Sequence, residues 1–273
     1  MFNDFSQPSI EDILQEIYNV SSPIAIDTET TGLNWISDRA FGFSFATANT
    51  SYFLRNSLYP IEALREVLKA IFDSKRPLVF HNLKFDAHMI KKTYGIEVPF
   101  IRSHDTFTIS YLHNNEERHG LKALACKYLS PDADKYEKFL HDYMKEYNIS
   151  SYASAPDHLL GIYGKKDAEY TYQLYTLLYP QLLMNDKKWY EIERQILKIT
   201  YQMEEHGILI DIPYVKGLIK KIEIELKRIE SEVQSNVGFP IDILSDDQIA
   251  KVLYEKEKIP ILRRTTPSPT FPN

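Results

Sequence analysis

The chain has 273 residues, a length that suits one large domain or one domain followed by a smaller unit. Its formal net charge of −6 at pH 7 argues against the broad basic coat with which proteins hold duplex DNA, although it allows a local basic groove. Hydrophobic residues make up 44% of the chain, and no apolar run approaches the ~20 residues of a membrane-spanning helix, so we expect a soluble globular protein without a membrane partner.

The first 95 residues predict strands and helices in the order typical of a mixed sheet. Three apolar segments with short connections indicate an antiparallel meander, and a fourth lies between two helical patterns. We expect strands at residues 23–27, 39–46, 51–55 and 76–82, and helices at residues 10–18, 60–74 and 84–95. Ser9 is placed to cap the first helix, and Gly95 to end the third. This order predicts an α/β fold with a mixed sheet flanked by helices.

Beyond residue 95 the pattern is largely helical. Cys126, the only cysteine, lies in the stretch LKALACKYL, whose helical periodicity favours a core residue over a reactive thiol. A single cysteine allows no intramolecular disulfide, and the N-terminus lacks the basic and apolar segments of a secretory signal. We therefore expect a reducing, intracellular (cytoplasmic) location.

The character of the chain changes after residue 183, where long amphipathic patterns with charges of both signs begin. We expect helices at residues 189–207, 213–238 and 245–258. The last residues, from about 263, include three prolines and no periodicity, which predicts an extended or disordered tail. The expected organisation is one domain at residues 1–183 and an α-helical C-terminal extension at 184–273.

Four acids and a tyrosine occupy positions that could serve one chemistry. Asp27 and Glu29 lie at the end of the first strand, and their carboxylates share a face because side chains of a strand alternate. Such a pair either faces water or holds a cation. Asp86 opens the helix after the fourth strand, and Asp167 lies one helical turn after Tyr163. Each residue alone is a weak signal, but the order D-x-E, N-x-x-x-D and Y-x-x-x-D is specific.

These motifs resemble those of the proofreading 3′–5′ exonuclease of family A DNA polymerases, a DEDD nuclease of ribonuclease-H-like fold. DTETTGL resembles the first exonuclease motif, HNLKFD the second and YGKKD the third, whose tyrosine indicates the DEDDy subclass. MEEHGILID and SDDQIAKVLYEKEKIPILRRT resemble the start of the polymerase domain. The sequence contains neither the Asp-Tyr-Ser strand nor the His-Asp-Glu turn of nucleotide addition, so we expect no polymerase activity from this chain alone.

The resemblance implies hydrolysis of phosphodiesters with two divalent cations, Mg²⁺ or Mn²⁺, which prefer hard oxygen ligands. The metal ligands would be Asp27, Glu29, Asp86 and Asp167. Asp27, Glu29 and Asp167 would hold the cation nearest the attacking water. Asp27 would bridge to the second cation, which Asp86 would reach directly or through water. Tyr163 would orient the attacking water through a hydrogen bond.

Positions in the matching motifs also imply contacts with the substrate. Leu33 would wedge against the terminal base, and Asn82 and Phe85 would hold the frayed strand, since stacking tolerates any base. Arg118 resembles a position that contacts DNA in the family. Simpler interpretations are that Phe85 is a core residue and that Arg118 is solvated. The two lysines of YGKKD either meet phosphate or face water.

The expected function is the removal of nucleoside 5′-monophosphates from the 3′ end of single-stranded or frayed DNA during proofreading. An RNA-trimming exonuclease of the ribonuclease D type would share the acids and the tyrosine, and a catalytically silent polymerase scaffold is a third interpretation. The polymerase-like C-terminal third favours DNA. If the chain is natural, its apolar C-terminal faces predict docking of a separate DNA polymerase chain; otherwise it is a fragment of a longer polymerase.

Overall fold

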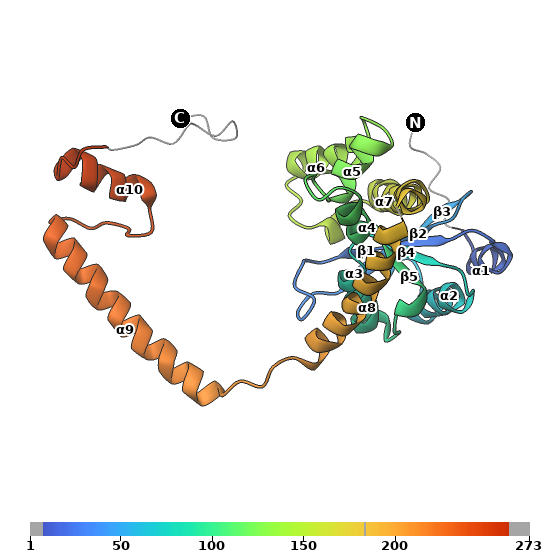
Figure 1. Cartoon of the computed structure of the whole chain (residues 1–273), viewed down its shortest axis with the longest axis horizontal. Coiled ribbons are helices and arrows are strands. Elements are labelled where there is room, and N and C mark those ends of the chain that lie inside the picture. The colour runs from blue at the N-terminus through green and yellow to red at the C-terminus, as the bar shows by residue number, and fades with distance from the viewer. Residues whose placement is uncertain (1–7, 183, 262–273) are drawn as a thin grey trace. The chain divides into compact units, whose positions relative to one another are not determined.

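The computed structural model describes residues 8–182 and 184–261, and the chain divides into two compact units with a boundary between His206 and Gly207. Figure 1 colours the chain from blue at its start to red at its end. The tail expected from about residue 263 lies outside the described residues. Within the described ranges, no helix has both the length and the apolar character that crossing a membrane requires.

The first unit is built on a five-stranded mixed sheet with the order β3-β2-β1-β4-β5. The strands are β1 (Ile24–Thr30), β2 (Ala40–Ala46), β3 (Ser51–Arg55), β4 (Leu78–Phe80) and β5 (Ser103–Asp105). The first three form the predicted antiparallel meander, whereas β4 pairs with β1, and β5 with β4, in parallel. The mixed sheet with flanking helices confirms the predicted fold class; β5 is a strand that the sequence pattern did not indicate.

Helices cover both faces of this sheet (Figure 1). The helices of the first unit are α1 (Ile10–Asn19), α2 (Ile61–Asp73), α3 (Leu83–Tyr94), α4 (Thr106–His113), α5 (Leu121–Tyr128), α6 (Lys135–Glu146), α7 (Asp157–Leu178) and α8 (Met184–His206). Short 3₁₀ turns lie at Phe100–Arg102, Tyr152–Ser154 and Tyr179–Gln181. Two predicted helix ends are confirmed: the Ser9 hydroxyl accepts from the Asp12 N–H at 3.1 Å, and Gly95 ends α3 with φ of 67°.

Alternate residues of β1 enter different hydrophobic cores. Ile26 packs in the cluster that contains apolar residues of α1, α2 and α3. Ala25 packs on the other face, with Leu174 of α7. Asp27 and Glu29 lie two and four residues after Ala25, so their side chains are on the same face of the sheet as that of Ala25. The strand therefore directs both acids toward α7.

Helix α8 belongs to the first compact unit, because it packs on the sheet's flanking elements. Its Tyr190 is 0% exposed, and its Tyr201 is 4% exposed. The Tyr190 hydroxyl accepts a hydrogen bond from the Asp105 N–H at 3.1 Å. The C-terminal end of α8 contacts α3, where the His88 ring lies between the carboxylates of two glutamates. The sequence pattern assigned the residues of α8 to the C-terminal region. The division of the chain into two domains at residue 183 stays a prediction.

The second unit contains α9 (Ile212–Val237), α10 (Asp246–Ala250) and a short π-helix at Lys251–Lys256. Asp211 caps α9 at its start and Gly238 ends it with φ of 83°. The predicted cap of the next helix is confirmed, because the Ser245 hydroxyl accepts from the Gln248 N–H. In the described structure α9 buries none of its side chains. Its expected apolar stripe is between 37% and 49% exposed at Leu218, Ile222, Leu226 and Ile229.

Candidate active site

The strand that carries the first two acids is longer than the sequence indicated. The predicted strand ends at Asp27, but β1 runs to Thr30, with a register irregularity between Glu29 and Thr30. Asp27 is paired with Ser44 of β2, and Glu29 with Gly42. Both carboxylates therefore project from a paired, rigid strand, which fixes their separation more tightly than a loop would.

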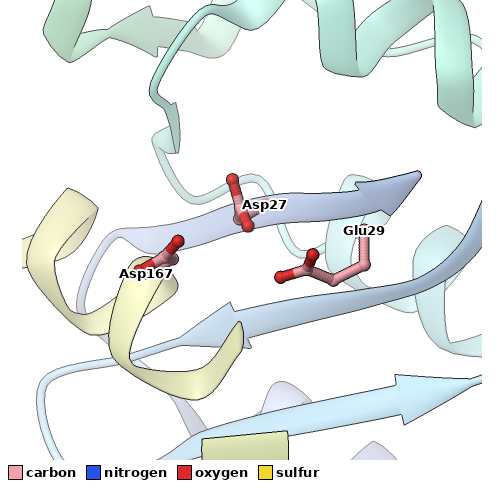
Figure 2. A group of neighbouring side chains, drawn as sticks. All are labelled: Asp27, Glu29 and Asp167. Atoms are coloured by element: carbon pink, nitrogen blue, oxygen red, sulfur yellow. The ribbon is translucent and has the colours of Figure 1, made fainter. Parts of the chain in front are cut away.

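Helix α7 brings the third acid and the tyrosine to the same face of the sheet. Oxygen atoms of Asp27, Glu29 and Asp167 all lie within 4.8 Å of one another. Figure 2 shows the three side chains converging from β1 and α7. Tyr163 lies one turn before Asp167, so both side chains point from α7 toward the strand. The predicted spacing of these residues thus produces one cluster.

Gly164, in the stretch YGKKD, allows α7 to approach the sheet this closely. A Cβ atom at residue 164 would lie 3.2 Å from Glu29 Oε1 and 3.1 Å from a ring carbon of Phe53. Both distances are shorter than ordinary van der Waals contact. A side chain at this position would require Glu29, Phe53 or α7 to shift by a few tenths of an ångström.

Asp86, in the first turn of α3, is held against the same strand from the other side. Its Oδ1 accepts from the Thr28 N–H at 3.2 Å and from the Thr28 hydroxyl at 2.6 Å. Thr28 lies between the two acids of β1, so this pair of bonds ties Asp86 to the acid cluster. Asp86 is 2% exposed and is not one of the three acids that lie within 4.8 Å of one another.

The acids share a strongly perturbed electrostatic environment. Burial raises the pKa of Asp27 to about 6. Burial and the neighbouring charge of Asp27 raise the pKa of Glu29 to about 8. The same two causes raise the pKa of Asp86 well above its ordinary value. Without a cation, the cluster therefore holds protons at a pH where isolated carboxyl groups have lost them.

This set of donors fits a divalent cation. Among the residues that the structure describes, no hydrogen-bond donor reaches the buried atoms Glu29 Oε1 and Asp86 Oδ2. Carboxylate oxygens are the ligands that Mg²⁺ and Mn²⁺ prefer, and a bound cation would favour the ionised form of each acid. The orphaned oxygens and the raised pKa values have the same physical cause, which is buried negative charge without sufficient compensation.

One charged residue of the site escaped the sequence reasoning. Lys122, near the start of α5, has a side chain that is 15% exposed, and its Nζ forms an ion pair with Asp167 Oδ1. The ammonium also lies 4.5 Å from the centre of the Tyr163 ring. Burial lowers the pKa of Lys122, while the charges of Asp27 and Glu29 oppose that shift. The sequence of this amphipathic stretch does not single out Lys122, because the position of the lysine beside α7 depends on tertiary packing.

A pocket of about 480 Å³ opens beside the acids. It is lined by residues 28–33 of β1 and the following loop, by Phe85, by residues 150–152 and by Tyr163. Two of the predicted substrate contacts, Leu33 and Phe85, are therefore in its wall, and Leu33 is 86% exposed. Tyr152 also lines the pocket, with its ring centre 5.9 Å from that of Tyr163. The sequence reasoning did not single out Tyr152.

The other predicted contacts lie outside the lining of this pocket. Asn82 is exposed, adopts φ of 78° before α3, and donates its backbone N–H to Asp105 Oδ1 at 2.9 Å. Arg118 is exposed in the loop before α5. Lys166 pairs with Glu169 of its own helix at 2.5 Å. Their roles toward the substrate stay predictions.

Known proteins with similar sequences are exonucleases and DNA polymerases. The 3′–5′ exonuclease family of the family A DNA polymerases matches residues 5–183. DNA polymerase I of Borreliella burgdorferi is 27% identical over 260 residues, which are 90% of this chain and 27% of that protein. The DNA polymerase of Escherichia phage T5 is 30% identical over 222 residues, which are 76% of this chain and 26% of that protein. The chain thus spans about a quarter of these relatives.

Solved structures share the fold at low sequence identity. NrnC of Brucella melitensis with bound Mg²⁺ superimposes with a TM-score of 0.53 at 24% identity, covering 72% of this chain and 92% of NrnC. The catalytic core of RRP6 from Trypanosoma brucei gives 0.51 at 16% identity, covering 69% of this chain and 50% of that core. These likenesses show the ribonuclease-H-like fold. The match of the family model over residues 5–183 shows that the chain belongs to the 3′–5′ exonuclease family of the family A DNA polymerases.

Proposed function

We propose that this exonuclease domain removes nucleoside 5′-monophosphates from the 3′ end of single-stranded or frayed DNA, and that it proofreads for a DNA polymerase. The observation that carries the proposal is the convergence of Asp27, Glu29 and Asp167 beside a pocket lined by Tyr163. This arrangement offers clustered oxygen ligands and a hydroxyl donor next to a space for the substrate, which are the elements that phosphodiester hydrolysis needs.

The four acids would hold two divalent cations, Mg²⁺ or Mn²⁺. Asp27, Glu29 and Asp167 would share one cation, and Asp27 and Asp86 would share the second. When bound, such cations activate water and neutralise charge on the phosphate oxygens. Asp27 and Glu29 must lose their protons before they can act as ligands, so their raised pKa values, about 6 and about 8, predict that activity rises with pH across this range.

Tyr163 would orient the attacking water and would not remove its proton. Burial, followed by the charges of Glu29 and Asp27, raises the pKa of Tyr163 well above its ordinary value. The phenol therefore stays protonated and can donate a hydrogen bond. Its position in the wall of the pocket, one turn from Asp167, supports this role.

The terminal nucleotides would enter the pocket beside Glu29. Leu33, exposed at the pocket, suits the wedge role because an apolar side chain there can pack against the last base. Phe85 and Tyr152 add aromatic surfaces on which bases can stack. Stacking distinguishes bases poorly, which suits an enzyme that must remove any incorrect terminal nucleotide.

The C-terminal part of the chain favours DNA as the substrate. The alignment with the DNA polymerase I of Borreliella burgdorferi covers 90% of the chain and so includes residues beyond the exonuclease match at 5–183. A DNA polymerase, in a separate chain or in the remainder of a longer one, would cover the exposed apolar stripe of α9. RNA trimming is the second candidate, since RRP6 has the same fold.

The test compares single-stranded DNA and RNA oligonucleotides of one sequence, labelled at the 5′ end, with Mg²⁺ or with EDTA. We expect stepwise shortening from the 3′ end of DNA, release of nucleoside 5′-monophosphates, and no reaction in EDTA. A 3′-blocked DNA should resist cleavage. Faster shortening of the RNA would favour the second candidate, and cleavage of a closed DNA circle would indicate an endonuclease.

A further inference from the structure

Lys122 differs from the other lysines of the site in how it is held. The two lysines of YGKKD lie on α7 itself, whereas Lys122 reaches the acids from α5. Its ammonium forms an ion pair with Asp167 and lies 4.5 Å from the ring centre of Tyr163 and 5.7 Å from that of Tyr170. The side chain therefore places one positive charge inside the acid cluster.

Charge attraction holds the Lys122 ammonium at this position. The ammonium is attracted by the carboxylates of Asp167, Asp27, Glu137 and Glu29. The π faces of two tyrosines add to this attraction. The same field of clustered carboxylates would attract a divalent cation.

Asp167 cannot pair with the Lys122 ammonium and bind a divalent cation at the same time equally well. Its Oδ1 pairs with Lys122 Nζ, and Asp167 is also one of the three acids whose oxygens lie within 4.8 Å of one another. A divalent cation among those oxygens would repel an ammonium in contact with one of them, because little water separates the two charges. The two positive groups are therefore alternatives at Asp167.

We propose that Lys122 is the resident counter-ion of the metal-free acid cluster, and that a divalent cation binds by displacing its ammonium from Asp167. Lys122 then has two effects. It holds Asp167 toward β1 when no metal is bound, and it raises the concentration of metal that the site requires. The inference rests on the proposed function only in naming the metal, since the exchange concerns binding and needs no nucleic acid.

Metal binding without substrate gives the direct test. Lys122→Met keeps the length and apolar stem of the side chain but removes the charge. Mn²⁺ and Mg²⁺ would be titrated calorimetrically into wild-type protein and this variant, at pH about 9 so that protons compete little for the carboxylates. We expect the variant to bind Mn²⁺ about tenfold more tightly, and its unfolding temperature to rise more between EDTA and saturating Mn²⁺.

Three further variants distinguish the exchange from a merely structural role. Lys122→Arg keeps the charge and should bind Mn²⁺ as weakly as the wild type, and Lys122→Gln replaces Lys122→Met if that variant does not fold. Lys69→Met, at an exposed lysine of α2, is the matched control and should change nothing. Equal Mn²⁺ affinity in wild type, Lys122→Met and Lys122→Gln would overturn the exchange but leave the nuclease proposal intact. Absence of Mn²⁺ binding in every protein would overturn both.

Discussion

Asp27 and Glu29 lie two residues apart on a paired strand, and that spacing sets the chemistry of the site. The alternation of β1 sends both carboxylates toward α7, where Asp167 joins them. Burial then makes the cluster costly unless protons, Lys122 or a metal compensate its charge. The residues that cost the fold stability are those that can hold a cation.

Replacement of a metal ligand should abolish hydrolysis and spare the fold. Asp27→Asn or Asp167→Asn keeps the side-chain shape but removes a charged oxygen ligand, so we expect turnover on single-stranded DNA to fall by more than about a hundredfold. Tyr163→Phe removes only an orienting hydroxyl and should cost about ten- to a hundredfold. Asp142→Asn, at an exposed residue of α6, is the control. Wild-type turnover by Asp27→Asn with a normal unfolding temperature would exclude this site.

The raised pKa of Glu29 predicts how stability depends on pH when metal is absent. The folded protein keeps this proton up to pH about 8, whereas the ordinary value for the unfolded chain is 4.5. Between these values the folded state binds more protons, so the free energy of unfolding should fall as pH rises through this window. The loss would be on the order of a few kcal/mol.

Unfolding temperatures measured in EDTA from pH about 5 to 9 test this dependence. Glu29→Gln cannot titrate and should flatten the fall, while Glu146→Gln, at an exposed glutamate, should leave it unchanged. Saturating Mn²⁺ should reverse the trend, because metal binding releases the proton. Parallel pH profiles for the wild type and Glu29→Gln would contradict the assignment.

Sequence alone could indicate the acids and the tyrosine, because their order along the chain and the strand and helix periods are local properties. The contact of Lys122 with the acids could not be predicted from such local properties. Lys122 lies in a stretch whose apolar periodicity predicts only an amphipathic helix, and a lysine there is usually solvated. Its contact with Asp167 arises because α5 packs on α7, which no local pattern encodes. Tyr152 was missed for the same reason.

At the scale of elements, the distance between α7 and the sheet controls the site. Gly164→Ala gains about 0.5–1 kcal/mol in helix propensity, but the added methyl would meet Glu29 and Phe53 at 3.2 and 3.1 Å. We expect little change in unfolding temperature and about a tenfold loss of Mn²⁺ affinity, because Asp167 moves from Glu29.

Calorimetric Mn²⁺ binding checks the effect of Gly164→Ala. The matched control is Gly217→Ala in α9, where an added Cβ would meet nothing within 4 Å. The Gly217→Ala variant should have the same gain in helix propensity without any change in Mn²⁺ affinity. If Gly164→Ala binds Mn²⁺ as the wild type does, the close approach of α7 is not what positions the acids.

At the scale of the whole molecule, the sheet and its flanking helices were predictable from the sequence, whereas β5 and the packing partners of α8 were not. The strand β5 has three residues and a polar sequence, SHD, so it shows no periodicity. Helix α8 follows the point at which sequence character changes, yet it completes the core of the first unit. Amphipathic periodicity predicts that a helix has a buried face but does not say which unit buries it.

Contacts lead from α8 back to the site. Tyr190 accepts from the backbone N–H of Asp105 at 3.1 Å, and Asp105 Oδ1 in turn accepts from the N–H of Asn82 at 2.9 Å. Asn82 immediately precedes α3, the helix that holds Asp86 against β1. Removing α8 should therefore disturb the position of Asp86 as well as the core.

Two truncations separate the contributions of α8 and of the second unit. A chain that ends at His206 keeps the first compact unit, so its unfolding temperature and its turnover on single-stranded DNA should match those of the full chain. A chain that ends at Leu182 loses Tyr190 and Tyr201, whose burial stabilises the fold by about 3–6 kcal/mol together. We expect this shorter chain to unfold at a lower temperature, to need a higher Mn²⁺ concentration for activity and to hydrolyse single-stranded DNA more slowly. Full activity after truncation at Leu182 would show that α8 does not support the site, and loss of activity after truncation at His206 would show that the second unit takes part in hydrolysis itself.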